Sequence, residues 1–338
     1  MPKKIGRQSF EISGTVGIAA AAGVVGKKEG DGPLGEEFDR VFEDVRMNED
    51  TWEKAESAMQ KCAVETALKK AGKAPGDVDI IMAGDLLGQS MGTTFGIRGL
   101  GIPFVGLYGA CSTMALSLGM ASLAVDSSAA GCAVAATSSH FCSAEKQFRL
   151  PLEYGGQRPP QAQWTATAAG AAVLSAEQSN VCIESVTFGK MCDLGITDAN
   201  NMGAAMAPAA ADTIYTHLSE RGVSPEEYDL IVTGDLGAVG SKLMYELLDK
   251  DYGLDITQRH RDCGLLIYDM NDRQINSGGS GCGCSAAVVC THFMRRLASG
   301  ELKKILFVGT GALLSQLSPL QGESVPSVAH AVVLKGGK

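Results

Sequence analysis

Residues 72–86 read GKAPGDVDIIMAGDL, and residues 222–236 read GVSPEEYDLIVTGDL. Each segment places a proline before a short apolar run that ends at Gly-Asp-Leu, a pattern that predicts a turn leading into a buried strand. At one constant offset the identical positions are Gly72/Gly222, Pro75/Pro225, Asp79/Asp229, Ile81/Ile231, Gly84/Gly234, Asp85/Asp235 and Leu86/Leu236. Agreement of this density indicates an internal repeat, so we expect two halves of similar structure.

A second pair of segments extends the repeat. Residues 109–123 (GACSTMALSLGMASL) and 282–297 (CGCSAAVVCTHFMRRL) each contain Cys-Ser followed by an apolar helical run, which aligns Cys111 with Cys284. A buried-strand pattern follows each run, at 129–139 and at 302–312. We therefore divide the chain into an N-terminal half at 1–178, which contains the Cys111 segment, and a C-terminal half at 179–338.

Apolar strands that alternate with helices are typical of sheets covered on both faces. Two such units related by pseudo-symmetry predict an α/β fold with α-β-α-β-α layers, in which helices 112–127 and 285–299 lie between the sheets. Strands are expected at 9–22, 78–83, 103–108, 131–137, 167–175, 181–188, 228–233, 265–269, 304–309 and 328–335. Further helices are expected at 51–71, 206–221 and 239–249, with Asp50 as the N-cap of the first. The polar, proline-containing segment 141–164 is predicted to be a long loop.

Composition narrows the class of protein. The chain has 338 residues, 45% of them hydrophobic and 20% charged, which is typical of a globular protein with a large core. The net charge of −9 argues against nucleic acid as a partner. The ten cysteines are scattered, mostly in apolar segments, which favours a reducing compartment over a disulfide framework. Cys282 and Cys284 have no further His or Cys cluster with zinc-site spacing, so we expect no metal and no cofactor.

The chain carries no signal for membrane insertion. Its N-terminus lacks the apolar stretch of a signal peptide. The most apolar windows, at 15–25 and 114–136, are respectively too short and too interrupted to span a bilayer. We expect a cytoplasmic fold whose only link to a membrane is peripheral.

The segment Gly109-Ala110-Cys111-Ser112 joins a predicted strand to a predicted apolar helix. Gly109 would permit a tight turn. Cys111 would then lie at a helix N-terminus, where free N–H groups and the helix dipole favour a reactive thiolate. A small apolar cysteine filling a tight corner explains the same pattern, and that interpretation is preferred for Cys284.

Four segments resemble the thiolase superfamily of thiolases and ketoacyl synthases: YGACSTMALSLGMASLAV (108–125), TAAGAAVLS (167–175), NSGGSGCGCSAAVV (276–289) and VGTGALLS (308–315). The resemblance implies a thiolase-like fold with Cys111 at the nucleophile position. More narrowly, YGACST (108–113), SSHFCSAEKQFRLPLEYGGQRPP (138–160) and TDANNMGAAMAPAAADTI (197–214) resemble the stage V sporulation protein AD family.

The catalytic pattern of the superfamily is incomplete in this sequence. Thiolase-like enzymes combine the cysteine with a histidine and a second His, Asn or Cys. The loop that follows the predicted strand 228–233 and the glycine-rich loop 277–284 contain no histidine. His140 ends a predicted strand and is placed at the pocket mouth, and Asn276 is a candidate for the missing asparagine. A catalytic role for His260 stays open, whereas His217, His292 and His330 are interpreted as structural.

The resemblance implies a non-catalytic protein that binds dipicolinic acid (pyridine-2,6-dicarboxylate), free or as its calcium chelate, for uptake into the developing spore. A flat ring with two carboxylates requires a narrow slot with cationic or N–H donors. The predicted ligand-binding residues are Cys111, Ser112, His140, Lys146, Arg149, Arg158, Lys190, Asn201 and Asn276. The alternatives are an acyl-transferring or condensing enzyme that uses Cys111, and an interaction subunit whose pocket is vestigial.

The family resemblance also implies partners. We expect a homodimer formed through a strand of the Cys111 unit, as in most of the superfamily. Attachment to the spore inner membrane would run through membrane-embedded proteins of the same stage V sporulation system, in a transport role that also concerns germination.

Overall fold

The computed structural model describes residues 1–148 and 158–337. The strands are β1 (Lys3–Lys4), β2 (Ser9–Glu11), β3 (Gly17–Gly26), β4 (Arg40–Phe42), β5 (Ile80–Gly84), β6 (Phe104–Gly106), β7 (Cys132–Ser139), β8 (Trp164–Thr165), β9 (Ala168–Ser175), β10 (Val181–Phe188), β11 (Leu230–Thr233), β12 (His260–Asp262), β13 (Gly279–Ser280), β14 (Lys304–Ala312) and β15 (Ser327–Gly336). The α-helices are α1 (Lys27–Gly30), α2 (Trp52–Lys70), α3 (Met91–Ile97), α4 (Thr113–Asp126), α5 (Phe141–Phe148), α6 (Met202–Arg221), α7 (Gly237–Tyr252), α8 (Cys263–Leu266), α9 (Cys282–Val288), α10 (Met294–Ser299) and α11 (Leu317–Leu320).

The two halves have the same strand order. In the first half the order is β6-β5-β7-β9-β3, and in the second it is β12-β11-β14-β15-β10. In each half the two outer pairs are parallel and the two inner pairs are antiparallel. The halves meet where β10 pairs with β3 at Cys182 and Gly17. This correspondence confirms the predicted pair of pseudo-symmetric units.

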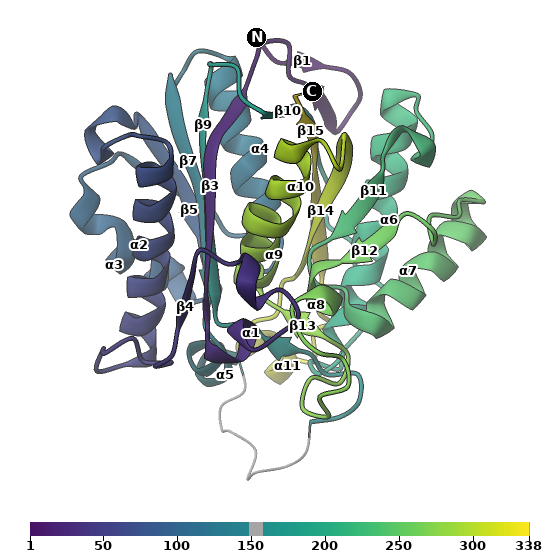
Figure 1. The fold of residues 1–338 in the computed structure, drawn as a ribbon. Helices are drawn as coiled ribbons and strands as arrows, with labels where there is room; N and C mark the ends of the chain where they lie inside the picture. The colour runs from purple at the N-terminus through teal and green to yellow at the C-terminus, as the bar shows by residue number, and fades with distance from the viewer. Residues whose placement is uncertain (149–157, 338) are drawn as a thin grey trace.

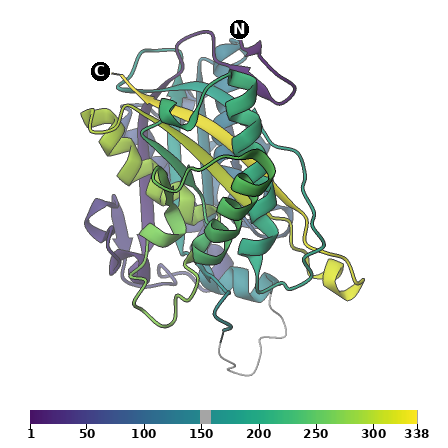
Figure 2. The same ribbon diagram turned by 90° about the vertical axis from the view of Figure 1, so that its right-hand side faces the viewer.

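Helices cover both outer faces and fill the space between the two sheets. In Figure 1, α2 and α3 lie on one outer side, α6 and α7 on the other, and α4, α9 and α10 between them. Figure 2 shows α6 and α7 in front of the second sheet, with the short helix α11 standing away from the body. The predicted α-β-α-β-α layering is therefore confirmed.

The central helix α4 explains this layering in sequence terms. Its residues Met114, Ala115, Leu118 and Ala121 are all fully buried, because sheets pack on both of its sides. A helix that is apolar all round belongs inside a protein rather than at its surface. Its first charged residue is Asp126, at the last turn, whose carboxylate accepts hydrogen bonds from the backbone N–H groups of residues 13 and 14.

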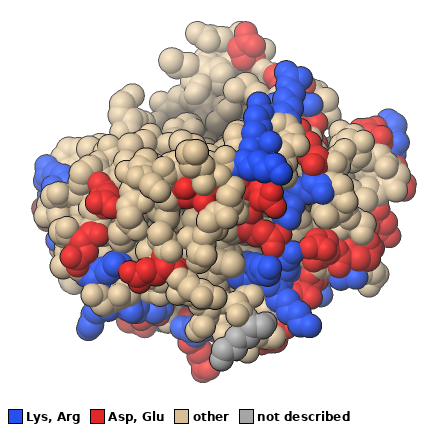
Figure 3. Space-filling view, turned by 90° about the horizontal axis from the view of Figure 1, so that it is seen from above, with Lys and Arg blue, Asp and Glu red and all other residues tan. Residues whose placement is uncertain are grey.

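Basic and acidic side chains are interleaved over the end of the molecule where both termini lie (Figure 3). Ion pairs join neighbouring elements in the second half. Glu184 of β10 pairs with Arg221 at 2.6 Å, with Lys304 at 3.1 Å and with Lys335 at 3.5 Å. These pairs connect β10 to α6, β14 and β15.

Several local predictions were wrong. The predicted strand 9–22 is divided into β2 and β3, and the segment 141–164, predicted to be a loop, contains α5 and β8. The predicted strand 265–269 is largely replaced by the short helix α8, because Asp262 caps that helix by accepting from the N–H of Leu265 at 3.2 Å. The N-cap of α2 is Thr51 rather than Asp50: its hydroxyl accepts from the N–H of Lys54, while the Asp50 carboxylate pairs with the Lys54 ammonium.

The predicted alignment of Cys111 with Cys284 is also wrong. Helix α4 begins at Thr113, two residues after Cys111, whereas α9 begins at Cys282, two residues before Cys284. The residue two positions before α9 is Ser280. The sequence alignment was displaced by four residues, because both helices start with small residues and a Cys-Ser pair occurs near each start.

Candidate functional site

The turn before α4 is strained and tightly hydrogen-bonded. Ala110 has a φ of 49°, in the left-handed region that side chains other than glycine seldom adopt. The Ser112 hydroxyl donates to the carbonyl of Gly109 and the Thr113 hydroxyl donates to that of Ala110, each at 2.6 Å. Gly109, predicted to supply the turn through its flexibility, is instead required for space, because a Cβ there would lie 2.6 Å from the Ser112 hydroxyl. Such strain in the backbone is a feature of functional sites.

Glycines of β14 let this strand pack directly on the turn. A Cβ on Gly311 would lie 2.2 Å from the carbonyl oxygen of Gly109, and a Cβ on Gly309 would lie 2.7 Å from the Cβ of Ala115. The repeated glycines of the segment 308–315 therefore permit close approach of two backbones. They hold Cys111 in place from behind.

A buried polar network joins Cys111 to the second half of the chain. The Cys111 thiol lies 3.9 Å from the Ser280 hydroxyl, which donates to Asp235 at 3.1 Å. The same carboxylate accepts from the Thr310 hydroxyl at 2.8 Å and from the N–H of Gly281 at 2.8 Å. The pseudo-two-fold relation places the two helix N-termini face to face, so Ser280 meets its structural counterpart Cys111.

The surroundings keep this thiol protonated. Burial, with Asp235 as the nearest negative charge, raises the pKa of Cys111 well above its usual value. Burial also raises the pKa of Asp235. These effects outweigh the start of α4, which would by itself favour the thiolate. A protonated thiol is a poor nucleophile.

Cys111 lies in a narrow cavity of about 60 Å³, which residues of α5 and β13 help to line. Its lining consists of Leu86, Ala110, Cys111, Ala144, Glu145, Phe148, Thr165, Ala199, Asn200, Met202, Ser280, Ala312 and Leu314. The lining is therefore mostly apolar, with a few polar side chains such as Thr165, Asn200 and Ser280. This described lining contains no histidine, lysine or arginine.

Two of the predicted ligand-binding residues, Ser112 and His140, form hydrogen bonds within the fold instead. Ser112 is fully buried and its hydroxyl is directed to its own turn. The imidazole of His140 lies outside the lining: Nε2 is 2.8 Å from the carbonyl oxygen of Val45, and Nδ1 accepts from the N–H of Cys142. Burial lowers the pKa of His140, so the ring is neutral.

The predicted cations are not gathered around Cys111. Arg158 pairs with the lining residue Glu145 at 2.6 Å, and its guanidinium lies over the rings of Phe141 and Trp164 at the edge of the pocket. Lys190 pairs with Asp212 at 2.8 Å. Arg149 lies outside the described residues.

Of the two predicted asparagines, neither lines the pocket. Asn201 is the N-cap of α6, since its side chain accepts from the N–H of Ala204 at 3.2 Å. Its neighbours Asn200 and Met202 do line the pocket. Asn276 is half-buried, and its φ of 54° marks it as a turn residue.

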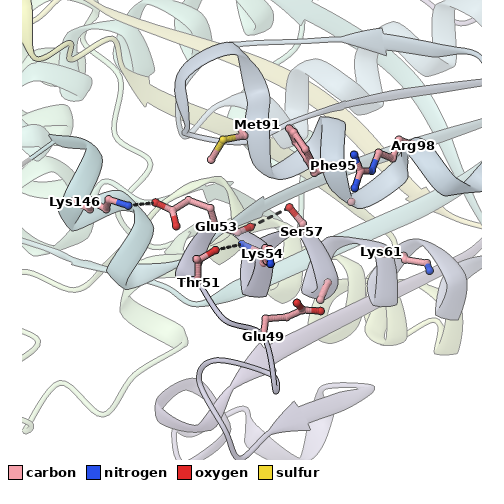
Figure 4. Close-up of a pocket in the computed structure, with 12 residues that line it drawn as sticks. Glu49, Thr51, Glu53, Lys54, Ser57, Lys61, Met91, Phe95, Arg98 and Lys146 are labelled. Atoms are coloured by element: carbon pink, nitrogen blue, oxygen red, sulfur yellow. Dashed lines mark hydrogen bonds and ion pairs between the residues drawn. The ribbon is translucent and has the colours of Figure 1, made fainter.

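Lys146 belongs to a different, larger hollow. This groove of about 600 Å³ lies between α2 and α3 and is lined by Glu49, Thr51, Glu53, Lys54, Ser57, Ala58, Lys61, Met91, Phe95, Gly96, Arg98 and Lys146. In Figure 4 the Lys146 ammonium points to Glu53, with which it forms an ion pair at 2.5 Å. The groove is larger than the Cys111 pocket, but the one buried polar side chain in its described lining, Ser57, already donates to the carbonyl of Glu53 on its own helix at 2.9 Å.

The sequence analysis missed Asp235, Ser280 and Thr310 as site residues. Asp235 carried a usable signal, because it lies two positions after the end of a predicted strand, and the C-terminal ends of parallel strands are where α/β proteins place their sites. Ser280 and Thr310 gave no local signal. They reach Cys111 only because the two halves face each other.

A family model described as Stage V sporulation protein AD matches residues 6–335. The chain is 44% identical over 333 residues to Stage V sporulation protein AD of Bacillus subtilis (strain 168), with 98% of each chain covered.

Solved structures of thiolase-like enzymes resemble this chain over nearly their full length. The 3-oxoacyl-[acyl-carrier-protein] synthase III from Aquifex aeolicus VF5 has a TM-score of 0.58 at 15% identity, with 95% of this chain and 100% of that chain covered. Human mitochondrial 3-ketoacyl-CoA thiolase in complex with CoA has a TM-score of 0.58 at 13% identity, with 97% and 99% covered. These likenesses establish the thiolase-like fold, and the sequence match is far more specific. The chain belongs to the stage V sporulation protein AD family.

Proposed function

We propose that this chain is a non-catalytic binding protein for dipicolinic acid, which it holds in the Cys111 pocket for uptake into the developing spore. Membership of the family gives it a role in sporulation. The observation that carries the proposal is a pocket at the nucleophile position of a thiolase-like fold, in which the Cys111 thiol is protonated and the described lining contains no histidine. Such a pocket can bind a ligand without forming a covalent bond to it.

The size of the pocket supports a small ligand. Its volume of about 60 Å³ is far below the roughly 300–1,000 Å³ of sites for drug-sized molecules. An acyl chain with its carrier would require a wider channel. The apolar side chains of Leu86, Phe148 and Met202 offer faces for a flat ring, and Asn200 and Thr165 offer polar groups for its edge.

The charge of the pocket supports a neutralised form of the ligand. Dipicolinate carries two carboxylates, but the described lining presents Glu145 and lies next to Asp235, with no cation of its own. Arg158 stands at the edge, and Glu145 already occupies its guanidinium. A bare dianion would therefore meet no unpaired cation in the described lining. We therefore propose the calcium chelate as the bound form.

The proposed partners are a second copy of the chain and membrane-embedded proteins of the same sporulation system at the spore inner membrane. The edge strand β6 supports the homodimer, because Phe104 and Val105 expose 40% and 37% of their surface there. Unpaired edge strands with exposed apolar side chains readily join another chain. In the described ranges, no helix combines the length and the apolar character of a bilayer-spanning segment.

Isothermal titration calorimetry tests the proposal. The purified chain is titrated with dipicolinate in the presence and absence of calcium, and with benzoate and acetyl-CoA as comparison ligands. Binding of the calcium chelate, with none of benzoate, is the expected result. We expect Cys111→Ala to weaken binding by about fivefold, because one neutral contact contributes about 1 kcal/mol. The matched control is Cys182→Ala, which changes a half-buried cysteine on β10.

Acyl transfer is the second candidate, favoured by the position of Cys111 in a fold shared with condensing enzymes. It requires a thiolate at neutral pH. Fast alkylation of Cys111 by iodoacetamide, with protection by acetyl-CoA, would support the enzymatic function and contradict the proposed binding function. Binding of acetyl-CoA without binding of dipicolinate would have the same consequence.

A further inference from the structure

Four large apolar side chains are exposed on two neighbouring segments of the second half. They are Met191, Leu194, Leu317 and Leu320, which expose 64%, 66%, 65% and 83% of their surface. We call this set the apolar tip. The loop 190–196 carries the first two residues, and α11, which projects from the body in Figure 2, carries the last two. A group of exposed apolar side chains on one projection indicates an interaction site.

Backbone hydrogen bonds join the two segments of the apolar tip. Cys192 and Ser327 form an antiparallel bridge, in which the N–H of Cys192 donates to the carbonyl of Ser327 at 2.8 Å and the reverse bond measures 2.7 Å. The N–H of Val325 donates to the carbonyl of Ile196 at 2.7 Å. The loop and the chain that returns from α11 therefore form one unit.

Hydrogen bonds within the segment hold α11 in shape. The N–H of Ser318 donates to the hydroxyl of Ser315 at 2.9 Å, and the N–H of Gln321 donates to the carbonyl of Leu317 at 3.1 Å. The leucine side chains of this short helix nevertheless remain in solvent. A segment that satisfies its backbone groups internally can enter an apolar medium at a lower free-energy cost.

The sequence around α11 is free of charge. Residues 305–322 include no Asp, Glu, Lys or Arg. Charged side chains resist transfer from water into lipid, whereas leucine favours it. The charged residues of the two segments are Lys190, which pairs with Asp212 at 2.8 Å, and the acidic Asp193 and Glu323. Attraction to anionic headgroups therefore has no source here, and apolar burial is the driving force that the apolar tip offers.

The apolar tip is continuous with the wall of the Cys111 pocket. The pocket lining includes two residues just before α11 and two just after the loop 190–196: Ala312, Leu314, Ala199 and Asn200. Both segments thus extend from the pocket to the tip. Whatever binds the tip lies beside the pocket.

We propose that the apolar tip inserts into the surface of a lipid bilayer and places the Cys111 pocket beside it. The projecting shape favours a bilayer, because a fluid medium accepts a convex group of side chains, whereas a folded partner would need a matching groove. This contact is with lipid itself and adds to the proposed attachment through membrane-embedded proteins. Insertion does not depend on the ligand, but release of a ligand next to the membrane rests on the function proposed above.

Flotation with protein-free vesicles tests the insertion. The purified chain is mixed with excess vesicles of phosphatidylcholine, or with vesicles that also contain phosphatidylglycerol, and is centrifuged at low and at high salt. We expect the chain to float with both kinds of vesicle at both salt concentrations, since burial of apolar groups is not screened by salt. Flotation with the anionic vesicles alone, lost at high salt, would overturn the proposal, as would absence of flotation with either.

A double variant assigns the binding to the apolar tip. Leu317→Ser with Leu320→Ser should weaken partition onto vesicles by about tenfold for each leucine, because transfer of one leucine out of water stabilises the bound state by at least that factor. The control is Phe95→Ser, which removes a side chain that is 53% exposed on α3, on an outer side of the first half (Figure 1). Its partition should equal that of the natural chain. Equal partition of the double variant and the natural chain would exclude the apolar tip.

Calorimetry without vesicles separates this proposal from the proposed function. The double variant should bind calcium dipicolinate as the natural chain does, because neither leucine lines the pocket. If the natural chain does not bind the ligand, the proposed function is wrong, and flotation still decides whether the apolar tip inserts. If the ligand binds and the chain does not float, insertion is wrong and the proposed function stands.

Discussion

At the scale of single residues, the neighbours of Cys111 decide what it can do. A cysteine next to a helix N-terminus is commonly activated, yet this thiol is only 5% exposed and lies near the buried carboxylate of Asp235. Burial and negative charge both favour the neutral thiol. The residue type at the nucleophile position of a fold is therefore not sufficient for catalysis, and the binding function proposed above needs no activated thiol.

Asp235 should be essential for the structure of this site. Asp235→Ala leaves the Gly281 N–H and the hydroxyls of Thr310 and Ser280 without their buried acceptor. We expect the free energy of unfolding in urea to fall by about 1–3 kcal/mol, the range for an unsatisfied buried donor. Asp251→Ala, at an exposed position on α7, should change it by less than about 0.5 kcal/mol. Equal stability of the two variants would contradict the network described for Asp235.

At the scale of elements, the pocket depends on how closely β14 approaches the turn before α4. Both elements are built from small residues at their contact, so the backbones touch through Gly309 and Gly311. Close packing of this kind transmits small displacements, because a protein interior has few voids to absorb them. The position of Cys111 is thus set by an element that lies about 200 residues away in the chain.

Gly311→Ala tests this contact. The added Cβ would lie 2.2 Å from the carbonyl oxygen of Gly109, and a backbone atom cannot rotate away. We expect a loss of about 1–3 kcal/mol in stability, as for other overpacked cores, together with loss of ligand binding. The control is Gly76→Ala, where nothing lies within 4 Å of the new Cβ. Normal binding by Gly311→Ala, measured by calorimetry, would show that the turn has room to move.

At the scale of the whole molecule, the two halves leave an edge strand at each end of the strand order, β6 and β12. The β6 edge presents Phe104 and Val105, with Tyr108 just beyond it at 48% exposure. Exposed apolar groups along an edge strand favour association. The pocket turn follows β6 in sequence, so a second copy on this edge would lie close to Cys111.

Light scattering tests the proposed homodimer. We expect a mass of twice the 35.1 kDa of one chain. Val105→Lys places a charge on the β6 edge and should give the monomer mass, because edge lysines block strand pairing. Leu320→Lys, which changes a side chain that is 83% exposed on α11, should leave the dimer intact. A natural chain of monomer mass would exclude the homodimer.

The sequence by itself determined the repeated architecture and the position of the pocket turn. The Gly-Asp-Leu repeat and the apolar helical runs depend on local periodicity, and the structure has them as matching strands and as α4 and α9. The absence of histidine from the loops that should carry it was also readable from the sequence. These features are local, so neighbouring residues contain the information that specifies them.

Only the tertiary structure decided which residues meet. Ser280 reaches Cys111 from 169 positions away, and Thr310 donates to Asp235 from 75 positions away. It also decided that His140 and Lys146 have partners away from Cys111. Burial and the nearby carboxylate of Asp235 keep the Cys111 thiol protonated, and both are properties of the folded chain that no local pattern of residues encodes.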